Sequence, residues 1–120
     1  MITFITGLPA SGKTHYAQTL GIAVLDEPST PQEITLFAKN HGNIAVIDPA
    51  LCIWHFQVAA RDQFPNSTWI YFANDPIQCT INAKRRIKNV TSSIYVLSRL
   101  YVIPPQAQVV PVWRDCNDFV

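Results

Sequence analysis

The chain has 120 residues, of which 48% are apolar and 14% are charged, so it is long enough and apolar enough for a buried core and is not a disordered protein. Nine basic residues against eight acidic ones give a net charge of +1, which excludes a protein that binds nucleic acid through a strongly basic surface. We therefore expect a single domain over residues 1–120, in which any contact with nucleic acid is local.

Short apolar runs alternate with helical patterns along the chain. Residues 2–6 are β-branched and aromatic, as in a strand, and the glycine-rich stretch 7–12 ends the run. Farther along, Thr30, Pro31 and Glu33 combine a capping box with proline at the first helical position. In chain order the expected elements are a strand over 2–6, a helix over 13–20, a strand over 22–25, a helix over 31–42, a strand over 43–47, a helix over 50–64, a strand over 68–73, helices over 75–88 and 92–101, and a strand over 109–110.

This order of elements indicates the fold class. The expected strands are apolar throughout rather than alternating, which suits a sheet covered by helices on both faces. Their alternation with helices favours parallel strands. We therefore expect an α/β fold, a three-layer sandwich around a five-stranded parallel sheet.

Residues 7–14 match the phosphate-binding pattern G-x-x-x-x-G-K-[ST] in full, between an expected strand and an expected helix. In such a loop the glycines let backbone N–H groups turn toward a phosphate, the lysine reaches the β- and γ-phosphates, and the hydroxyl holds Mg²⁺. Lys13 is therefore an expected catalytic residue and Thr14 an expected metal ligand. The nucleotide-binding residues expected here are Gly7, Leu8, Pro9, Ala10, Ser11, Gly12, Lys13 and Thr14.

With this motif the chain resembles the P-loop kinases of the nucleoside and nucleotide kinase group, and the order of strands and helices extends the likeness over the whole chain. The resemblance implies a sheet of order 2-3-1-4-5 and a phosphotransferase that uses ATP and Mg²⁺. The sequence contains no Asn-Lys-x-Asp guanine motif, so a GTPase is not expected.

Acidic residues follow the second and third expected strands. Asp48 ends an apolar run, as a carboxylate beside Mg²⁺ would; the alternative is a cap for the helix begun by Pro49, and both roles are compatible. Asp26 and Glu27 reach the same edge of the sheet as the phosphate loop, because parallel strands end there together. The resemblance to deoxynucleoside and thymidylate kinases implies that Asp26 or Glu27 orients or deprotonates an attacking hydroxyl. A solvated turn is the alternative.

Kinases also bring arginines over the phosphates. The basic cluster at residues 84–88 closes an expected helix, and the polar stretch 89–93 after it would serve as a short lid. Arg85 and Arg86 are the expected catalytic residues of this cluster, because guanidinium groups fit phosphate oxygens. The alternative is a favourable charge at the carboxyl end of a helix.

Trp113 and Arg114 follow the last expected strand, where the family resemblance places the adenine contacts. Tryptophan can stack on a purine, and arginine can cover its other face. A half-buried structural tryptophan is the alternative.

The stretches 71–86 and 110–114 resemble small kinases encoded by bacteriophages, among them the 5-hydroxymethyluracil DNA kinases of the thymidylate kinase group. The likeness implies transfer from ATP to a nucleoside-like acceptor, most specifically the hydroxymethyl group of 5-hydroxymethyluracil in phage DNA. Residues 84–88, with Lys39 and His41, would then form a local basic track for the modified DNA. The alternatives are a kinase of a free nucleoside or nucleotide, and a P-loop ATPase or nucleotide-binding switch module.

The three cysteines, Cys52, Cys79 and Cys116, lack the spacing of a metal site or disulfide framework and predict buried thiols in a reducing compartment. No apolar run approaches the roughly 18 residues of a membrane span, and the first residues lack the basic region of a signal peptide. We expect a cytoplasmic protein, in the host cytoplasm if phage-encoded, without a membrane partner. The oligomeric state is left open.

Overall fold

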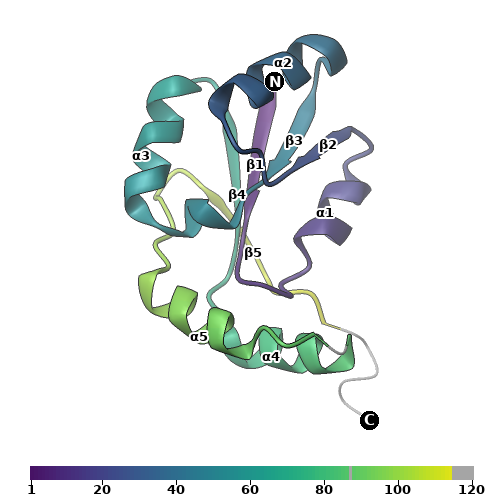
Figure 1. Ribbon diagram of the computed structural model, residues 1–120, viewed down its shortest axis with the longest axis vertical. Coiled ribbons are helices and arrows are strands. Elements are labelled where there is room, and N and C mark those ends of the chain that lie inside the picture. Colours follow the sequence, from purple (N-terminus) through teal and green to yellow (C-terminus); the bar gives the residue numbers. More distant parts are fainter. Residues whose placement is uncertain (87, 115–120) are drawn as a thin grey trace.

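The computed structural model describes residues 1–86 and 88–114. Its centre is a five-stranded sheet of order β2-β3-β1-β4-β5, in which every neighbouring pair is parallel (Figure 1). The α/β fold expected from the sequence pattern and the order 2-3-1-4-5 implied by the resemblance are both confirmed. The strands are β1 (Ile2–Thr6), β2 (Ala23–Asp26), β3 (Ile44–Ile47), β4 (Thr68–Phe72) and β5 (Gln108–Val110).

Helices cover both faces of this sheet (Figure 1). Phe4 and Ile5 point to opposite faces, as successive residues of a strand must. Ile5 belongs to a core closed by α1, α4 and α5, whereas Phe4 belongs to a second core closed by α2, α3 and the 3₁₀ turn η1. The result is the expected three-layer sandwich. The helical elements are α1 (Lys13–Thr19), α2 (Pro31–His41), η1 (Pro49–Cys52), α3 (Trp54–Gln63), α4 (Pro76–Arg85) and α5 (Thr91–Leu100).

The segment expected as one helix over 50–64 is divided, and that prediction was wrong. Asp48 Oδ1 accepts a hydrogen bond from Ala50 N at 3.0 Å and starts η1, after which Ile53 is extended with φ −102°. Leu51 and Cys52 are buried in η1, and α3 begins only at Trp54. Burial against the sheet therefore overrides the local helical pattern.

The capping box expected at Thr30 is confirmed, and Asp75 and Gly42 also mark helix ends. Thr30 Oγ1 accepts a hydrogen bond from Glu33 N at 3.3 Å, and Asp75 Oδ1 accepts one from Gln78 N at 3.1 Å. Gly42 ends α2 with a φ of 77°. Thr30 and Asp75 fix where α2 and α4 begin after β2 and β4. They therefore help to determine which side chains lie at the carboxyl edge of the sheet.

Cys52 and Cys79 are buried free thiols, as predicted, and Cys116 lies outside the described residues. Within the described ranges, the structure contains no helix that is both long enough and apolar enough to cross a bilayer.

Candidate active site

The loop between β1 and α1 has the backbone of a phosphate cradle. Ala10 and Gly12 take left-handed conformations with φ of 64° and 103°. A Cβ on Gly12 would lie 2.5 Å from Trp113 Cβ, and a Cβ on Gly7 would lie 2.5 Å from Ser11 Oγ. The two glycines are therefore needed by the loop's own geometry, as the motif predicts.

The side chains in this loop fit an anionic ligand. Lys13 Nζ donates hydrogen bonds to Gly7 O at 3.1 Å and Leu8 O at 2.8 Å, so the ammonium group lies over the loop. Ser11 Oγ is buried, and no other described residue hydrogen-bonds to it. Burial lowers the pKa of Lys13, an effect that a bound phosphate would oppose by pairing with the ammonium.

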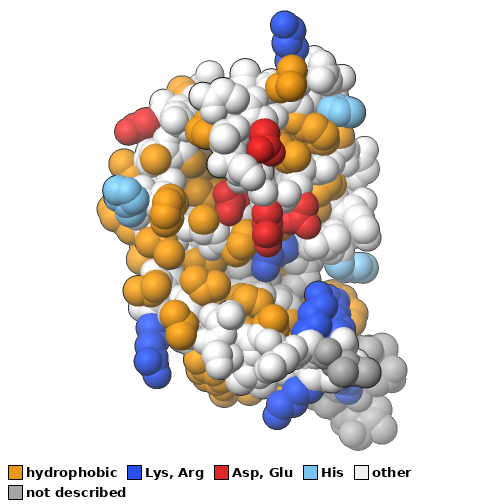
Figure 2. All heavy atoms as spheres, in the orientation of Figure 1, with side chains coloured by type: hydrophobic (Ala, Val, Ile, Leu, Met, Phe, Trp, Pro, Cys, Tyr) orange, Lys and Arg blue, Asp and Glu red, His pale blue; other side chains and the backbone are white. Residues whose placement is uncertain are grey.

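Three carboxylates lie at the carboxyl ends of β2 and β3. Asp26 and Glu27 are exposed, whereas Asp48 is half-buried. Burial raises the pKa of Asp48, and the neighbouring charges of Glu27 and Asp26 add to this effect, while the hydrogen bond from Ala50 opposes it. Figure 2 shows acidic side chains gathered in the middle of this face, directly above a basic one.

The position of Glu27 is set by the backbone. Its φ of 49° is left-handed, and its N–H donates to Ile47 O at 2.8 Å, which continues the pairing of β2 with β3. The turn therefore holds Asp26 and Glu27 beside the end of β3. Both carboxylates are close enough to Lys13 for their charges to raise its pKa, against the effect of burial.

A metal here would have few protein ligands. Among the described residues, no group of three or more His, Cys, Asp and Glu side chains could hold a metal ion. Mg²⁺ fits this limit, because it is commonly held by one or two carboxylates together with substrate phosphates. The helix cap uses one oxygen of Asp48, so capping and metal binding are compatible at this residue.

The expected lid is not a separate loop. α4 ends at Arg85 and α5 begins at Thr91, so residues 91–93 form the first turn of a helix and only 89–90 of the expected stretch are irregular. Arg85 and Arg86 are both exposed. The Arg86 guanidinium lies 5.5 Å from the Trp113 ring centroid, which brings the basic cluster next to the segment after β5.

Trp113 and Arg114 lie against the phosphate loop. Trp113 N donates to Ser11 O at 2.9 Å, and the Trp113 ring lies 6.0 Å from the ring of His15. Arg114 Nε donates to Gln78 Oε1 at 2.9 Å. A cavity of about 530 Å³ opens beside them, lined by Ala73, Asp75, Pro111, Val112, Trp113 and Arg114. We call it the base-side cavity.

A second cavity, of about 300 Å³, lies beside Asp48 between α2 and α3. Sequence patterns gave no signal for it, because its lining comes from four separate segments. None of the described residues that line it is basic, and three are phenylalanines. We call it the Asp48 cavity. Its lining residues are Phe4, Pro28, Ser29, Thr30, Pro31, Ile34, Asp48, Ala50, Leu51, Phe56, Ala59, Ala60, Gln63 and Phe64.

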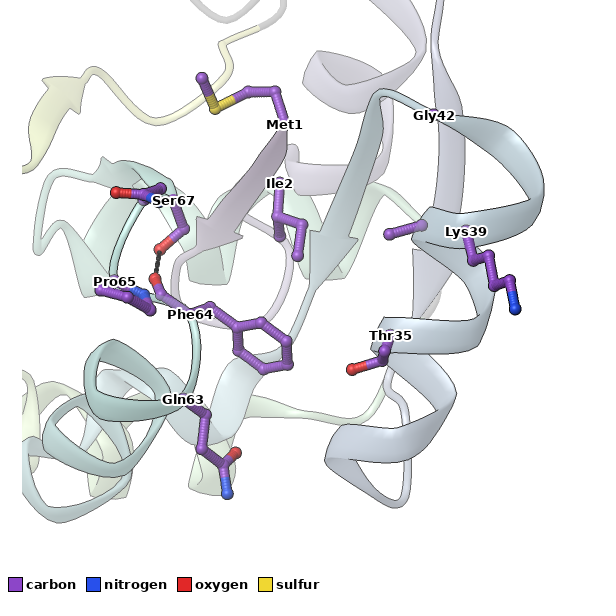
Figure 3. Close-up of a pocket in the computed structure, with 11 residues that line it drawn as sticks. Met1, Ile2, Thr35, Lys39, Gly42, Gln63, Phe64, Pro65 and Ser67 are labelled. Carbon is purple, nitrogen blue, oxygen red and sulfur yellow. Dashed lines mark hydrogen bonds between the residues drawn. The ribbon is translucent and has the colours of Figure 1, made fainter.

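A third cavity lies at the opposite, amino-terminal edge of the sheet (Figure 3). Ile2 and the ring of Phe64 face it, and Ser67 Oγ donates to Phe64 O at 2.6 Å beside it. Lys39 also lines it. The sequence predicts a basic track of residues 84–88 with Lys39 and His41. Lys39 and His41 end α2, whereas residues 84–85 end α4, and these helices lie at opposite ends of the molecule (Figure 1), so that expectation was wrong.

Solved structures of kinases share this fold. A gluconokinase from Sinorhizobium meliloti 1021 superposes with a TM-score of 0.66 at 12% identity, over 94% of this chain and 83% of that one. A sugar kinase from Janibacter sp. HTCC2649, in its unliganded structure, gives a TM-score of 0.55 at 12% identity, over 92% of this chain and 83% of that one. No family model and no curated protein matches the sequence. At this identity the comparisons show that the chain shares the fold of these two kinases, and they show the fold alone.

Two polar residues at the site were not found from the sequence. Gln78 and Asn82 are buried on α4, with 4% and 1% of their surface exposed, and Asn82 contacts the phosphate loop. The spacing of four residues puts them on one face of the helix. That spacing was a usable signal, but polar residues on a helix usually face solvent.

Proposed function

We propose that this protein is a kinase that transfers the γ-phosphoryl group of ATP to a hydroxyl group of a nucleoside-like acceptor. The observation that carries the proposal is that one edge of the sheet holds both the Lys13 loop and the Asp48 cavity. The Lys13 loop suits a triphosphate, and the Asp48 cavity offers a pocket for the acceptor beside a carboxylate. The kinase folds found among solved structures support the same reaction class.

In this proposal each residue has a defined task. Lys13 offsets the negative charge on the transferring phosphoryl group, and Arg86, with Arg85, adds positive charge from the end of α4. Thr14 and Asp48 would hold Mg²⁺, which supplies further charge neutralisation when bound. Trp113 and Arg114 would contact the adenine.

The acceptor hydroxyl needs a base or an orienting group. The acceptor oxygen forms a bond to the γ-phosphorus while the bond to the β,γ-bridging oxygen breaks, so ADP leaves and the hydroxyl proton is released. Glu27 or Asp26 would take or direct that proton, because both are close enough to Asp48 for their charges to act on it, and Pro28, the next residue, lines the Asp48 cavity.

The lining of the Asp48 cavity favours an uncharged ring as the acceptor. Phe56 and Phe64 supply aromatic surface, and no described lining residue is basic, so a phosphate group would find no counter-charge there. A pyrimidine base with a 5-hydroxymethyl group suits this pocket. We therefore propose, more narrowly, 5-hydroxymethyluracil in phage DNA as the acceptor, with the DNA phosphates outside the cavity. A free nucleoside is the second candidate, and the same argument counts against a nucleotide.

A single transfer experiment separates these acceptors. γ-Labelled ATP is incubated with an oligonucleotide that contains 5-hydroxymethyluracil, with the same oligonucleotide containing thymine, with free 5-hydroxymethyluridine and with thymidine monophosphate. We expect label on the modified oligonucleotide alone. Label on the free nucleoside but not on DNA would replace the narrower proposal with a nucleoside kinase.

ATP hydrolysis is measured in the same samples. Hydrolysis that no acceptor stimulates, without label transfer, would contradict the kinase proposal and favour an ATPase or switch module. Lys13→Ala is the control for contaminating kinases, since no label should appear with that variant.

A further inference from the structure

A buried side-chain amide joins the phosphate loop to the segment after β5. Asn82 Nδ2 donates one hydrogen bond to Ala10 O at 2.9 Å and another to Trp113 O at 2.8 Å. Only 1% of the surface of Asn82 is exposed. One rigid group on α4 therefore binds two backbone segments that are far apart in sequence.

Gln78 sets the orientation of this amide. Asn82 Oδ1 accepts a hydrogen bond from Gln78 Nε2 at 3.1 Å, so the Nδ2 donors of Asn82 are directed at the two carbonyls. Gln78 Oε1 in turn accepts from Arg114 Nε at 2.9 Å. Reversing either amide would place oxygen against oxygen, so the hydrogen bonds run in one direction, from Arg114 through Gln78 to Asn82.

The segments that Asn82 joins are those expected to hold the two ends of a nucleotide. Ala10 lies in the phosphate loop and is left-handed with φ 64°, a strained conformation for alanine that its surroundings must hold. Trp113 borders the base-side cavity, and its N–H donates to Ser11 O at 2.9 Å. Residues 10–12 and 112–114 are thus bound to each other directly and through α4.

We propose that Asn82, oriented by Gln78, is a positioning residue that fixes the spacing between the phosphate loop and the base-side cavity, so that one nucleotide engages both at once. The proposal rests on the ATP binding of the proposed function. It explains why the protein would bind a complete nucleotide more tightly than either of its fragments. Two half-sites held at the correct spacing bind a linked ligand far more tightly than either fragment. If the spacing is free to vary, this advantage is lost.

The test compares ATP with its two fragments, adenosine and inorganic tripolyphosphate, in equilibrium binding. The variant Asn82→Asp keeps the size of the side chain but replaces the two donors with an acceptor facing two carbonyls. We expect its affinity for ATP to fall by about 10-fold to 100-fold, by analogy with the loss of a group that orients a metal ligand. Affinity for adenosine should change by less than about threefold. Affinity for tripolyphosphate should fall less than affinity for ATP, because the new carboxylate repels both anions but only ATP spans the two half-sites.

Two further variants control for folding and for the substitution itself. Gln78→Glu keeps an acceptor for Arg114 but removes the donor to Asn82, so it should show the same pattern more weakly. Asn74→Asp makes the same chemical change at an exposed amide that donates to Ser98 O at 3.0 Å, and it should bind ATP like the wild type. If thermal denaturation shows that Asn82→Asp does not fold, Gln78→Glu supplies the test.

The possible outcomes separate this inference from the function on which it rests. Wild-type protein that binds neither ATP nor tripolyphosphate contradicts the proposed function itself. ATP affinity in Asn82→Asp that equals the wild-type value, or that falls only as much as the affinity for a fragment, overturns the positioning role and leaves the kinase proposal intact.

Discussion

Lys13 is the side chain on which the proposed chemistry depends most. Its ammonium group contacts only carbonyls of its own loop, at Gly7 and Leu8, among the hydrogen bonds of the described residues. Its loss therefore removes little packing between elements, and it also removes a charge that burial disfavours, since burial lowers the pKa of Lys13. We expect Lys13→Ala to lower kcat by about 10²–10³-fold or more, with the unfolding midpoint nearly unchanged.

The measurement is label transfer from ATP together with thermal denaturation. Lys39→Ala is the matched control, because Lys39 lies at the opposite edge of the sheet and should be dispensable for transfer. Wild-type turnover by Lys13→Ala would show that the loop does not bind the transferring phosphate.

The thiols of Cys52 and Cys79 offer a second test, of packing around the loop. Burial raises the pKa of each to about 12, and Cys52 Sγ also donates to Gly7 O at 3.6 Å. At pH 8 a thiol with that pKa is ionised to only about one part in 10⁴, and the thiolate is the reactive form. We expect a disulfide reagent at pH 8 to leave both unmodified in the folded protein and to modify both in denaturant. A Cys116→Ser variant restricts the assay to these two, and rapid modification in the folded state would contradict their burial.

At the scale of elements, local signals predicted most boundaries well. The strand positions, the cap at Thr30 and the end at Gly42 depend on residues close together in sequence, so the sequence pattern contains them. The break at Ile53 does not, because it arises from burying Leu51 and Cys52 against the sheet. The residues of segment 50–64 alone do not show that it packs against the sheet, so its pattern could not predict this break.

The junction of the phosphate loop with α1 depends on close approach as well as on backbone conformation. Gly12 and Gly21 both have positive φ, of 103° and 67°, so alanine is strained at either position. A Cβ at Gly21 would meet no atom within 4 Å, whereas at Gly12 it would lie 2.5 Å from Trp113 Cβ. We expect Gly21→Ala to lower the free energy of unfolding by about 1–2 kcal/mol. Gly12→Ala should lose about 1–3 kcal/mol more, from overpacking against Trp113.

Urea denaturation of the two variants measures this difference. Gly21→Ala isolates the cost of the backbone conformation, and Gly12→Ala should in addition weaken ATP binding. Equal losses of unfolding free energy in the two variants would show that Trp113 does not pack closely against residue 12.

At the scale of the whole molecule, some parts of the candidate site could be predicted from the sequence and others could not. The phosphate loop is contiguous, and its motif states the chemistry directly. The Asp48 cavity and the pair formed by Gln78 and Asn82 depend on which segments the fold brings together, and in the sequence they are ordinary apolar and polar residues. The order of the strands decides which distant segments lie beside the phosphate loop. That order was predicted from the family resemblance and not from the periodicity of the sequence.

The distribution of charge over the molecule limits how tightly the protein could bind DNA that contains 5-hydroxymethyluracil. Carboxylates of Asp26, Glu27 and Asp48 gather near the acceptor pocket, and the net charge is only +1, so a DNA strand must depend on the cluster at residues 84–88 for contacts to its phosphates. The proposed function places Arg85 and Arg86 of that cluster over the phosphates of ATP, which leaves Lys84 and Lys88 for the DNA. Lys39 lies at the opposite edge of the sheet and cannot join them. DNA binding should therefore be weak and steeply dependent on salt.

If Lys84 and Lys88 neutralise about two phosphates, affinity for modified DNA should fall by roughly 10-fold between 50 and 200 mM salt. Turnover of the modified oligonucleotide at subsaturating concentration should fall with it, plain DNA should stay inert, and ATP hydrolysis without DNA should be much less sensitive. Lys84→Ala should reduce the slope of log affinity against log salt by about 1, whereas Lys39→Ala should leave the slope unchanged. A slope that neither variant alters would mean that the cluster does not contact the DNA backbone. Efficient transfer to a free nucleoside with none to modified DNA would leave the small-molecule kinase as the function of this fold.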